Sequence, residues 1–381
     1  MDLICFSHIK WNFVYQRPQH LLNRFAIYHR VFVIEEPQTT DGETRYDIRK
    51  VSDENNLWVV DIFVSDKTPE EKINTAIATL LDSLLFSHDI KNYILWYYSP
   101  MALEYSNHLR PRMILYDCMD ELSAFKFAPP ALKQREQELL AGADLVFTGG
   151  HSLYEAKKHL HKNIHPFPSS IDKSHFLKAR NPLTEPEDQR DVPHPRFGFY
   201  GVIDERFDIP LLEEIAKKKP EWHFMLVGPV IKIDEASLPR LENIHYTGGK
   251  TYEKLPFYLS GWDIALLPFA INESTQFISP TKTPEYLAGG KPVISTPITD
   301  VVKPYGVQNL VHIAKTADEF IAAAEKILSN TAEEISAWKT RVDAYLSGIS
   351  WNDTWHRMNA LIEQTLAKKH EKNNLNTKIY V

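Results

Sequence analysis

The sequence predicts an α/β protein in which two Rossmann-like, doubly wound parallel-sheet domains face a central cleft. Three observations support this fold class: the chain has 381 residues, short apolar runs alternate with amphipathic helical patterns, and the alternation stops once and then restarts. A chain of this length exceeds the size at which a single core usually keeps growing, so we expect two domains. Strands that alternate with helices form βαβ units, which build parallel sheets.

Residues 1–175 are assigned to an N-terminal domain, because they contain one series of apolar runs that end in polar or glycine residues. The expected strands lie at residues 2–9, 30–36, 56–62, 92–99, 112–120 and 144–150. The expected helices lie at residues 17–29, 70–85 and 131–143. Each helical pattern lies between two apolar runs, so this half predicts a Rossmann-like domain.

Residues 176–195 are rich in proline and charge and have no apolar period, which is typical of a linker. The alternation restarts in residues 196–350, which we assign to a C-terminal domain of the same type. Its expected strands lie at residues 196–203, 222–229, 243–249, 263–269, 291–296 and 309–314, and its helices at 207–219, 252–262 and 316–330. Residues 351–381 predict an amphipathic helix that packs back toward the N-terminal domain, followed by a frayed tail from residue 370.

Composition excludes several classes of protein. A hydrophobic fraction of 43% with 24% charged residues is ordinary for globular proteins, and a net charge of −7 argues against a general nucleic-acid binder. No run approaches the ~20 apolar residues that cross a bilayer, and the N-terminus lacks the basic start of a signal peptide, so we expect a cytoplasmic protein. Cys5 and Cys118 lie in apolar runs and are expected to be free thiols. The chain has no His-Glu-x-x-His, paired Cys-x-x-Cys or Asp-x-Asp motif, so we expect no metal.

The stretch FISPTKTPEYLAGGKPVIST, residues 277–296, predicts a helix N-terminus that leads into a buried strand. Ser279 suits the N-cap and Pro280 the first helical position, and the helix is expected to end before Gly289. Backbone N–H groups at residues 279–281 and the charge of Lys282 would make an anion site, with phosphate as the obvious ligand. An ordinary capped helix with a solvated lysine is the alternative.

The C-terminal domain opens with FGFYGVIDERFD, in which Gly201 ends a strand and Arg206 lies in the loop that would face the cleft. An arginine there can bind phosphate through two parallel hydrogen bonds. A surface ion pair of Arg206 with Glu205 or Asp208 is the alternative. The absence of G-x-G-x-x-G and G-x-x-x-x-G-K-[ST] motifs argues against a dinucleotide-dependent dehydrogenase and a P-loop enzyme.

From GFYGVIDERFD through VGP, IHYTGGKTYEKLPFYLSGWDIALLPF and SPTKTPEYLAGGKPVIST, the second half resembles the donor-binding domain of the GT-B glycosyltransferases called glycosyl transferases group 1. The subgroup it resembles is the teichuronic acid glycosyltransferase-like proteins, some of which begin much as WNFVYQRPQHLLNRFA does. The resemblance implies a transferase of cell-surface polysaccharide synthesis, without a cofactor, that uses a nucleoside-diphosphate sugar, with UDP as the expected nucleotide. It also implies that residues 1–175 hold the acceptor.

The resemblance also assigns roles to residues on the donor side. It implies that Glu285 binds the ribose hydroxyls and that Lys282 and Arg206 hold the diphosphate. The donor site we expect comprises Gly201, Arg206, Ser279, Pro280, Thr281, Lys282 and Glu285. The family's first glutamate would lie at Phe277, where this chain has no carboxylate, and Glu273 is a speculative substitute. Its absence leaves open whether the sugar is transferred with retention or inversion.

The expected catalytic residues are Lys282, Arg206 and Asp120. Lys282, Arg206 and the helix start would stabilise the charge that grows on the leaving diphosphate, without a metal. If the reaction inverts, a general base must take the proton of the acceptor hydroxyl, and Asp120, at the end of a predicted strand, is our choice. The alternative is that Asp120 caps the following loop or helix.

The loop and helix SHIKWNFVYQRPQHLL suggest the acceptor side. Trp11 and Tyr15 suit the apolar face of a sugar, and Arg17 and His20 would contact sugar or phosphate. A loop packed on its own aromatic side chains is the alternative. The basic and apolar residues of 17–30 suit either an anionic membrane that holds a lipid-linked acceptor or a Rossmann helix against its sheet, and we favour the helix.

Two other functions remain open at this stage. A nucleotide-sugar epimerase can have the same two-domain fold, so donor binding alone would not prove transfer. The formation of a new glycoside, in place of an isomerised sugar nucleotide, separates these two activities. A non-catalytic relative that keeps only nucleotide binding is the second alternative, suggested by the missing glutamate at Phe277.

Overall fold

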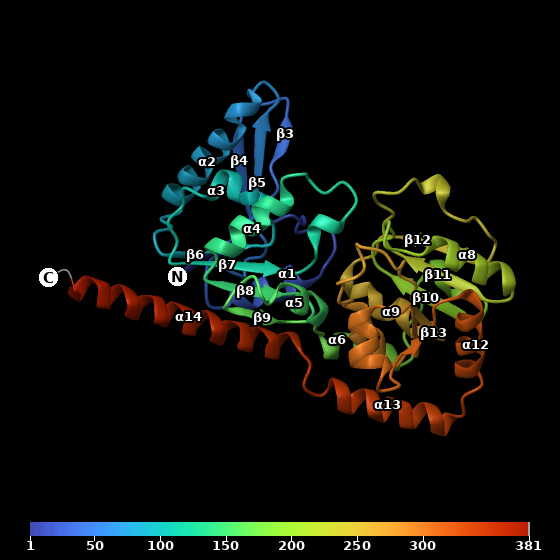
Figure 1. The fold of residues 1–381 in the computed structure, drawn as a ribbon. Coiled ribbons are helices and arrows are strands. Elements are labelled where there is room, and N and C mark those ends of the chain that lie inside the picture. Colours follow the sequence, from blue (N-terminus) through green and yellow to red (C-terminus); the bar gives the residue numbers. More distant parts are fainter. Residues whose placement is uncertain (380–381) are drawn as a thin grey trace.

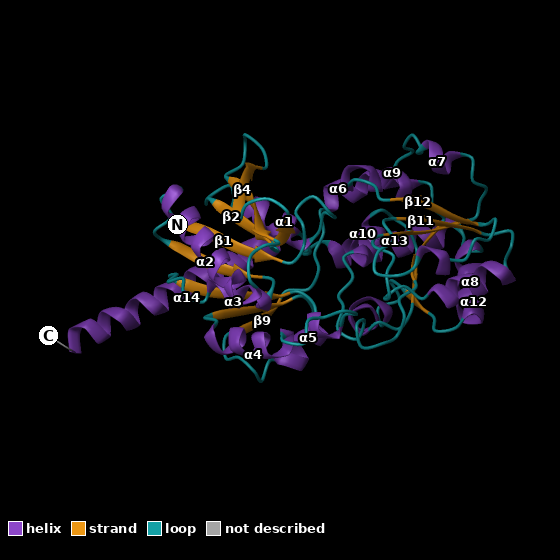
Figure 2. Cartoon of the chain, turned by 90° about the horizontal axis from the view of Figure 1, so that it is seen from above, coloured by secondary structure: helices purple, strands orange, loops and turns teal. Residues whose placement is uncertain are grey.

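The computed structural model describes residues 1–379 and contains two α/β domains, each built on its own sheet (Figure 1). The two sheets lie side by side along the molecule, and the last two helices run along one edge of both domains (Figure 1). The predicted fold class, with two doubly wound domains, is therefore confirmed. Helices flank the strands of each sheet, as the 90° view shows (Figure 2).

The first sheet has nine strands in the order β3-β5-β2-β1-β6-β7-β8-β9, with β4 paired to β5. These strands are β1 (Asp2–Ser7), β2 (Val31–Glu35), β3 (Gln38–Thr40), β4 (Arg45–Lys50), β5 (Leu57–Ser65), β6 (Tyr93–Tyr97), β7 (Met113–Cys118), β8 (Leu145–Thr148) and β9 (Ile164–Pro166). All pairs are parallel except β4 with β5, which is antiparallel. The sequence did not predict β3, β4 or β9, because β3 and β9 are very short and β4 is largely exposed.

Residues alternate between the two faces of this sheet, as the pleat requires. On β1, Leu3 and Cys5 join one core cluster, and Ile4 and Phe6 join the other. The helices of this domain are α1 (Arg17–Phe25), α2 (Glu70–Ser87), α3 (Leu103–Ser106), α4 (Leu132–Gly142) and α5 (His151–Lys157). Helix α1 packs on the Leu3 face and α2 on the Ile4 face, so the sheet is covered on both sides.

The second sheet is parallel throughout, in the order β12-β11-β10-β13-β14-β15. Its strands are β10 (Arg196–Tyr200), β11 (His223–Val227), β12 (Ile244–Gly248), β13 (Ile264–Leu267), β14 (Val293–Ser295) and β15 (His312–Ile313). Its helices include α8 (Ile209–Lys218), α9 (Leu255–Ser260), α10 (Lys282–Ala288), α11 (Thr299–Val301), α12 (Ala317–Leu328) and α13 (Ala332–Leu346). Every expected strand of this half corresponds to one of these strands.

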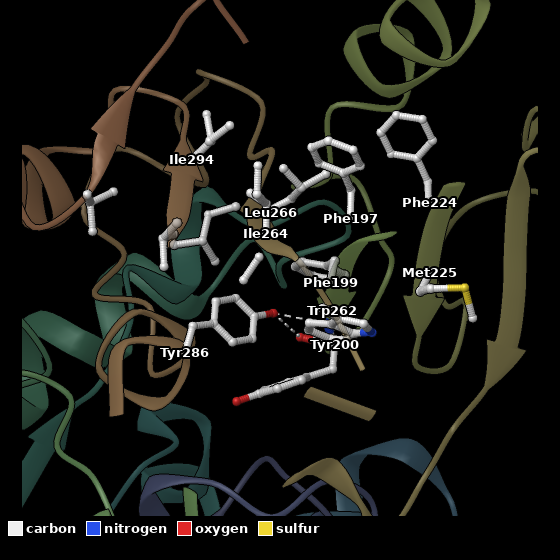
Figure 3. Packing of buried hydrophobic residues seen from close by; sticks show 14 of the residues in the cluster. Phe197, Phe199, Tyr200, Phe224, Met225, Trp262, Ile264, Leu266, Tyr286 and Ile294 are labelled. Carbon is white, nitrogen blue, oxygen red and sulfur yellow. Dashed lines mark hydrogen bonds between the residues drawn. The ribbon is translucent and has the colours of Figure 1, made fainter. Parts of the chain in front are cut away.

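Large aromatic side chains fill the core of the second domain around β10 (Figure 3). The indole of Trp262 lies against Gly198, where a Cβ atom would come within 1.8 Å of the ring. The hydroxyl of Tyr286 accepts a hydrogen bond from the backbone N–H of Tyr200 at 2.9 Å, so α10 is fixed to the end of β10. This contact sets the position of the polar residues on α10.

Residues 176–195 were expected to be a linker. Short helices that pack on the second domain lie within this segment or overlap its start. These are α6 (Lys173–Leu177), a 3-10 turn (Lys178–Arg180) and α7 (Glu187–Arg190). The guanidinium of Arg180 donates to the carbonyl of Ala288 at 2.7 Å and forms an ion pair with Asp343. The side-chain amide of Gln189 donates to a backbone carbonyl, and its oxygen accepts from the indole of Trp262. Charged and polar side chains therefore hold this segment in place, although they made it look like a linker.

Helix α14 (Trp351–Ile379) returns to the first domain, while α13 packs on the second (Figure 1). Trp351, Trp355 and Met358 of α14 are buried in the core cluster of the first domain. The chain thus crosses between the domains twice, once before α6 and once between α13 and α14. The helix continues past residue 370, where we expected a tail, and residues 380–381 of that tail lie outside the described part of the chain.

A buried ion pair fixes the start of α1 inside the first domain. The Nε of Arg17 donates to both carboxylate oxygens of Asp117, at 3.1 and 3.0 Å, and Nη1 donates to the carbonyl of Phe167 at 2.7 Å. Both side chains of the pair are at most 5% exposed. The bonds join the first residue of α1, the end of β7 and the segment where the chain leaves this domain.

We expect Arg17→Met to lower the free energy of unfolding of the first domain by about 3–5 kcal/mol, because it leaves the buried carboxylate of Asp117 unpaired. Chemical denaturation followed by circular dichroism measures the change. Arg45→Met is the matched control: Arg45 pairs with Asp47 at the surface, with 46% and 57% of the two side chains exposed, so the substitution should cost about 1 kcal/mol or less. Equal losses in the two variants would contradict this prediction.

Candidate active site between the two domains

Each sheet has a point where the strand order reverses, and ligands of doubly wound sheets bind beyond the carboxyl ends of the strands at such points. In the first sheet the reversal lies between β1 and β6, and in the second it lies between β10 and β13. The loop after β1 begins at His8, and the loop after β10 begins at Gly201. Residues of the two domains that meet between these loops form the candidate active site.

The side chain of Lys282 lies directly over Gly201. A Cβ atom at Gly201 would come within 2.2 Å of the Cε and 2.7 Å of the Nζ of Lys282. The φ angle of Gly201 is 137°, a backbone conformation that side chains disfavour. Gly228 adopts a φ of 158°, and a Cβ atom there would lie 1.8 Å from the carbonyl oxygen of Gly201. Because both glycines lack a side chain, the backbone at Gly201 can lie close to Gly228 and to Lys282. This places the ammonium group at the end of β10.

Helix α10 begins at Lys282, so the expected start at Pro280 is wrong. Ser279 forms hydrogen bonds across the domain boundary: its carbonyl accepts from Ser169 Oγ at 2.5 Å, and its own Oγ accepts from the N–H of Ser169 at 3.4 Å. Thr281 takes the N-cap position without a side-chain capping bond. The segment before α10 is therefore bonded to the first domain.

Glu285 is buried on α10 and accepts a hydrogen bond from the hydroxyl of Tyr200 at 2.8 Å. Burial raises the pKa of the Glu285 carboxyl, and both this hydrogen bond and the charge of Lys282 oppose the rise. Burial also lowers the pKa of Lys282, an effect that the charge of Glu285 opposes and that of Arg206 reinforces. One turn of helix thus holds an acid and a base close together in a poorly solvated place.

Arg206 pairs with Asp204, and not with Glu205 or Asp208, the partners considered in the alternative interpretation of the sequence. Its Nε and Nη2 donate to the Asp204 carboxylate, the shortest bond being 2.6 Å, and the guanidinium lies 5.2 Å from the ring centre of Phe125 in the first domain. Both residues lie in the tight loop after β10. There the Asp204 carboxylate also accepts a hydrogen bond from the backbone N–H of Arg206 at 3.0 Å. Arg206 therefore lies between the two domains.

Asp120 follows β7 and lies close to this group of cations. Burial raises the pKa of the Asp120 carboxyl to about 6, and the charges of Arg206, Arg17 and Lys282 oppose that rise. The structure therefore brings together the three residues that were expected to be catalytic, from three separate elements of both domains.

The four residues expected on the acceptor side divide into two groups. Trp11 is 8% exposed, and its backbone N–H donates to Glu35 at 2.8 Å. Arg17 is used in the buried pair described above. Tyr15 stacks on Tyr252 of the second domain at 4.7 Å. The ring of His20 meets that of Tyr252 edge to face at 5.4 Å and stacks on Trp351 at 4.7 Å. Tyr15 and His20 therefore contribute to an aromatic contact between the domains, while Trp11 and Arg17 hold the loop to the first domain.

Sequence reasoning missed Tyr252 and Asp300. The ring of Tyr252 stacks on His175 at 4.3 Å, and its buried hydroxyl lacks a hydrogen-bond partner. Burial and the nearby charge of Glu285 raise the pKa of Tyr252, so this ring adjoins the expected donor site. Asp300 accepts from the N–H of Ser152 at 3.0 Å and so caps α5 from the other domain. Both roles depend on contacts between distant segments, so neither residue gave a signal in the sequence.

Residues 1–379 contain no cluster of three or more histidine, cysteine or acidic side chains arranged to bind a metal ion. Within the same range, each helix is too short or too polar to cross a membrane.

The chain is similar to known glycosyltransferases in sequence. Residues 195–330 match the model of the family described as glycosyl transferases group 1. TuaH of Bacillus subtilis (strain 168), a protein named as a teichuronic acid biosynthesis glycosyltransferase, is 28% identical over 282 residues, which cover 68% of this chain and 69% of TuaH.

Solved structures share the fold over nearly the whole chain. A sucrose-phosphate synthase from Thermosynechococcus elongatus has a TM-score of 0.74 at 14% identity, covering 97% of this chain and 100% of its own. A UDP-forming α,α-trehalose-phosphate synthase from Burkholderia xenovorans has a TM-score of 0.68 at 12% identity, covering 96% of this chain and 99% of its own. The expected resemblance is confirmed by these matches. Residues 195–330 therefore form a glycosyl transferases group 1 domain, and the chain is a glycosyltransferase with the GT-B fold.

Proposed function

We propose that this enzyme transfers a sugar from a nucleoside-diphosphate sugar to a saccharide or lipid-linked saccharide, without a metal ion. The observation that carries the proposal is the placement of Lys282 over Gly201, at the reversal point of the second sheet. The charges of the buried Glu285 and of Arg206 both act on Lys282 there. Such a site offers positive charge for a diphosphate and a carboxylate for the ribose.

The donor binds in this proposal with its ribose at Glu285 and its diphosphate at Lys282 and Arg206. The hydrogen bonds of Arg206 to Asp204 use Nε and Nη2, so Nη1 can donate to a phosphate oxygen. When the bond between the anomeric carbon and the diphosphate breaks, negative charge grows on the bridging oxygen. Fixed cations in a poorly solvated site stabilise that charge strongly, because they need little reorganisation.

The acceptor completes the reaction by forming a glycosidic bond through its hydroxyl oxygen. Its proton must leave, and in an inverting reaction Asp120 accepts it. Burial already raises the pKa of this carboxyl to about 6, which makes it a better base than an ordinary aspartate. The nucleoside diphosphate departs with the electron pair of the broken bond.

The relatives suggest the donor and the setting. We infer a UDP-sugar, because one structural neighbour is a UDP-forming synthase, and a role in cell-surface polysaccharide synthesis, because TuaH is named for teichuronic acid biosynthesis. A lipid-linked acceptor would place the enzyme in the cytoplasm at the inner face of the membrane. Analysis of products by mass spectrometry and NMR tests the activity: a new glycoside supports transfer, and an isomerised sugar nucleotide indicates an epimerase.

Glu285→Gln should weaken UDP binding by about tenfold or more, because the amide nitrogen cannot accept a hydrogen bond from a ribose hydroxyl. The amide oxygen still accepts from Tyr200, so the fold should be preserved. Isothermal titration and a thermal-shift panel of UDP, GDP, ADP, CMP and phosphate provide the measurement. Glu273→Gln is the matched control, because Glu273 is exposed. Weaker binding in the control alone would instead give Glu273 the role of the missing glutamate.

Gly201→Ala should reduce turnover by about 100-fold, as much as Lys282→Met, because the added methyl group displaces the ammonium group. Steady-state kinetics with a UDP-sugar compares the two variants. Gly142→Ala is the control, since an added Cβ there meets nothing within 4 Å. Full activity of Gly201→Ala would show that the position of Lys282 does not matter for transfer.

The value of kcat/KM should fall both below and above neutral pH. Asp120 is ionised only above its raised pKa of about 6, so activity declines as the pH falls through that value. Lys282 is charged only below its pKa, which burial lowers, so activity declines at a pH below the usual lysine value of about 10.4. A pH profile of kcat/KM measures both limits. Lys282→Arg should move the alkaline limit upward, and an unchanged limit would exclude Lys282 as its source.

A further inference from the structure

His8 lies at the reversal point of the first sheet and faces the second domain. It directly follows β1, whose neighbours are β2 and β6. Its Nδ1 atom is buried without a hydrogen-bond partner. A buried polar atom without a partner costs free energy, so its presence at a ligand-binding edge of a sheet suggests that a ligand satisfies it.

The surroundings of His8 keep its ring neutral. Burial and the charge of Lys232 together lower the pKa of His8 to about 4, and an interaction with the backbone of Tyr98 partly offsets them. Lys232 belongs to the second domain, and its ammonium group lies 5.7 Å from the ring centre of Phe125 in the first. The ring of His8 thus adjoins both domains and carries no charge near neutral pH.

A neutral imidazole restricts the chemistry of its partner. An uncharged ring cannot form an ion pair with phosphate or carboxylate. A hydroxyl group suits Nδ1 in either tautomer of the ring, because a hydroxyl both donates and accepts hydrogen bonds. Among the common groups of a glycosyltransferase substrate, the sugar hydroxyl therefore fits this position best.

We expect the donor on the second-domain side of His8 and the acceptor on the first-domain side. The nucleotide groups of the donor are expected at Glu285, Lys282 and Arg206, on the second domain. Of the loop residues expected to hold the acceptor, Trp11 and Arg17 are bonded within the first domain. His8 belongs to the same loop, and its Nδ1 is still without a partner.

We propose that Nδ1 of His8 forms a hydrogen bond with a hydroxyl group of the acceptor sugar and thereby holds the acceptor at the carboxyl end of β1. This inference rests on the proposed function, because it presupposes a donor site on the second domain. It assigns a binding contact to His8, and the reaction needs no proton transfer to it.

The test compares His8→Leu with His8→Asn. Leucine removes the polar atom, while the side-chain amide of asparagine places an oxygen or nitrogen near the position of Nδ1. The same substitutions at His159, which is exposed after α5, are the matched controls. The assay uses a UDP-sugar with a panel of p-nitrophenyl hexosides as acceptors. It measures the KM for the acceptor, the ratio of transfer to donor hydrolysis, and the affinity for UDP.

His8→Leu should raise the KM for the acceptor about tenfold and shift the products toward donor hydrolysis, with the affinity for UDP unchanged. His8→Asn should recover most of the loss, and the His159 variants should behave as the wild type does. An unchanged acceptor KM in His8→Leu would overturn the proposal, as would a wild-type enzyme that hydrolyses the donor but glycosylates no hexoside. A wild-type enzyme that binds no nucleotide would instead overturn the proposed function.

Discussion

The close contact between Lys282 and Gly201 is the constraint on which the rest of the candidate site depends. Only a residue without a Cβ atom leaves room for the lysine side chain, and only the positive φ of Gly201 turns the chain away from β10 at that point. The bond between Tyr286 and Tyr200 holds α10 in register with the same strand end. The buried Glu285 and the loop that carries Arg206 are then placed around the ammonium group.

The buried charges of the candidate site are only partly balanced by one another. Arg206 is already paired with Asp204, while burial lowers the pKa of Lys282 and raises those of Glu285 and Asp120. Each of these shifts reflects a charge that lacks sufficient solvation. A diphosphate beside Lys282 would supply the missing opposite charge and raise its pKa again. In the proposed donor complex, binding and the protonation of Lys282 would therefore favour each other.

The sequence was enough to predict the buried strands and helices, because their signal lies in neighbouring residues. The long apolar runs form the central strands of both sheets. Gly201, Lys282 and Glu285 were each expected in the donor site from the sequence. Contacts between distant segments were not predictable. Arg17 was expected to contact sugar or phosphate, whereas the partner that buries it, Asp117, lies on β7, 100 residues away in the sequence. The cap that Asp300 supplies to α5 likewise exists only because the two domains meet.

The two crossings of the chain between the domains restrict how the domains can move. A single connection would allow the second domain to swivel in any direction, whereas two connections at separate points define an axis. Rotation about that axis would change the distance between the two domains at the candidate site. The burial of Trp351 and Trp355 against the first domain anchors one end of this hinge. Such a rotation would widen or narrow the proposed substrate site while each domain keeps its own core.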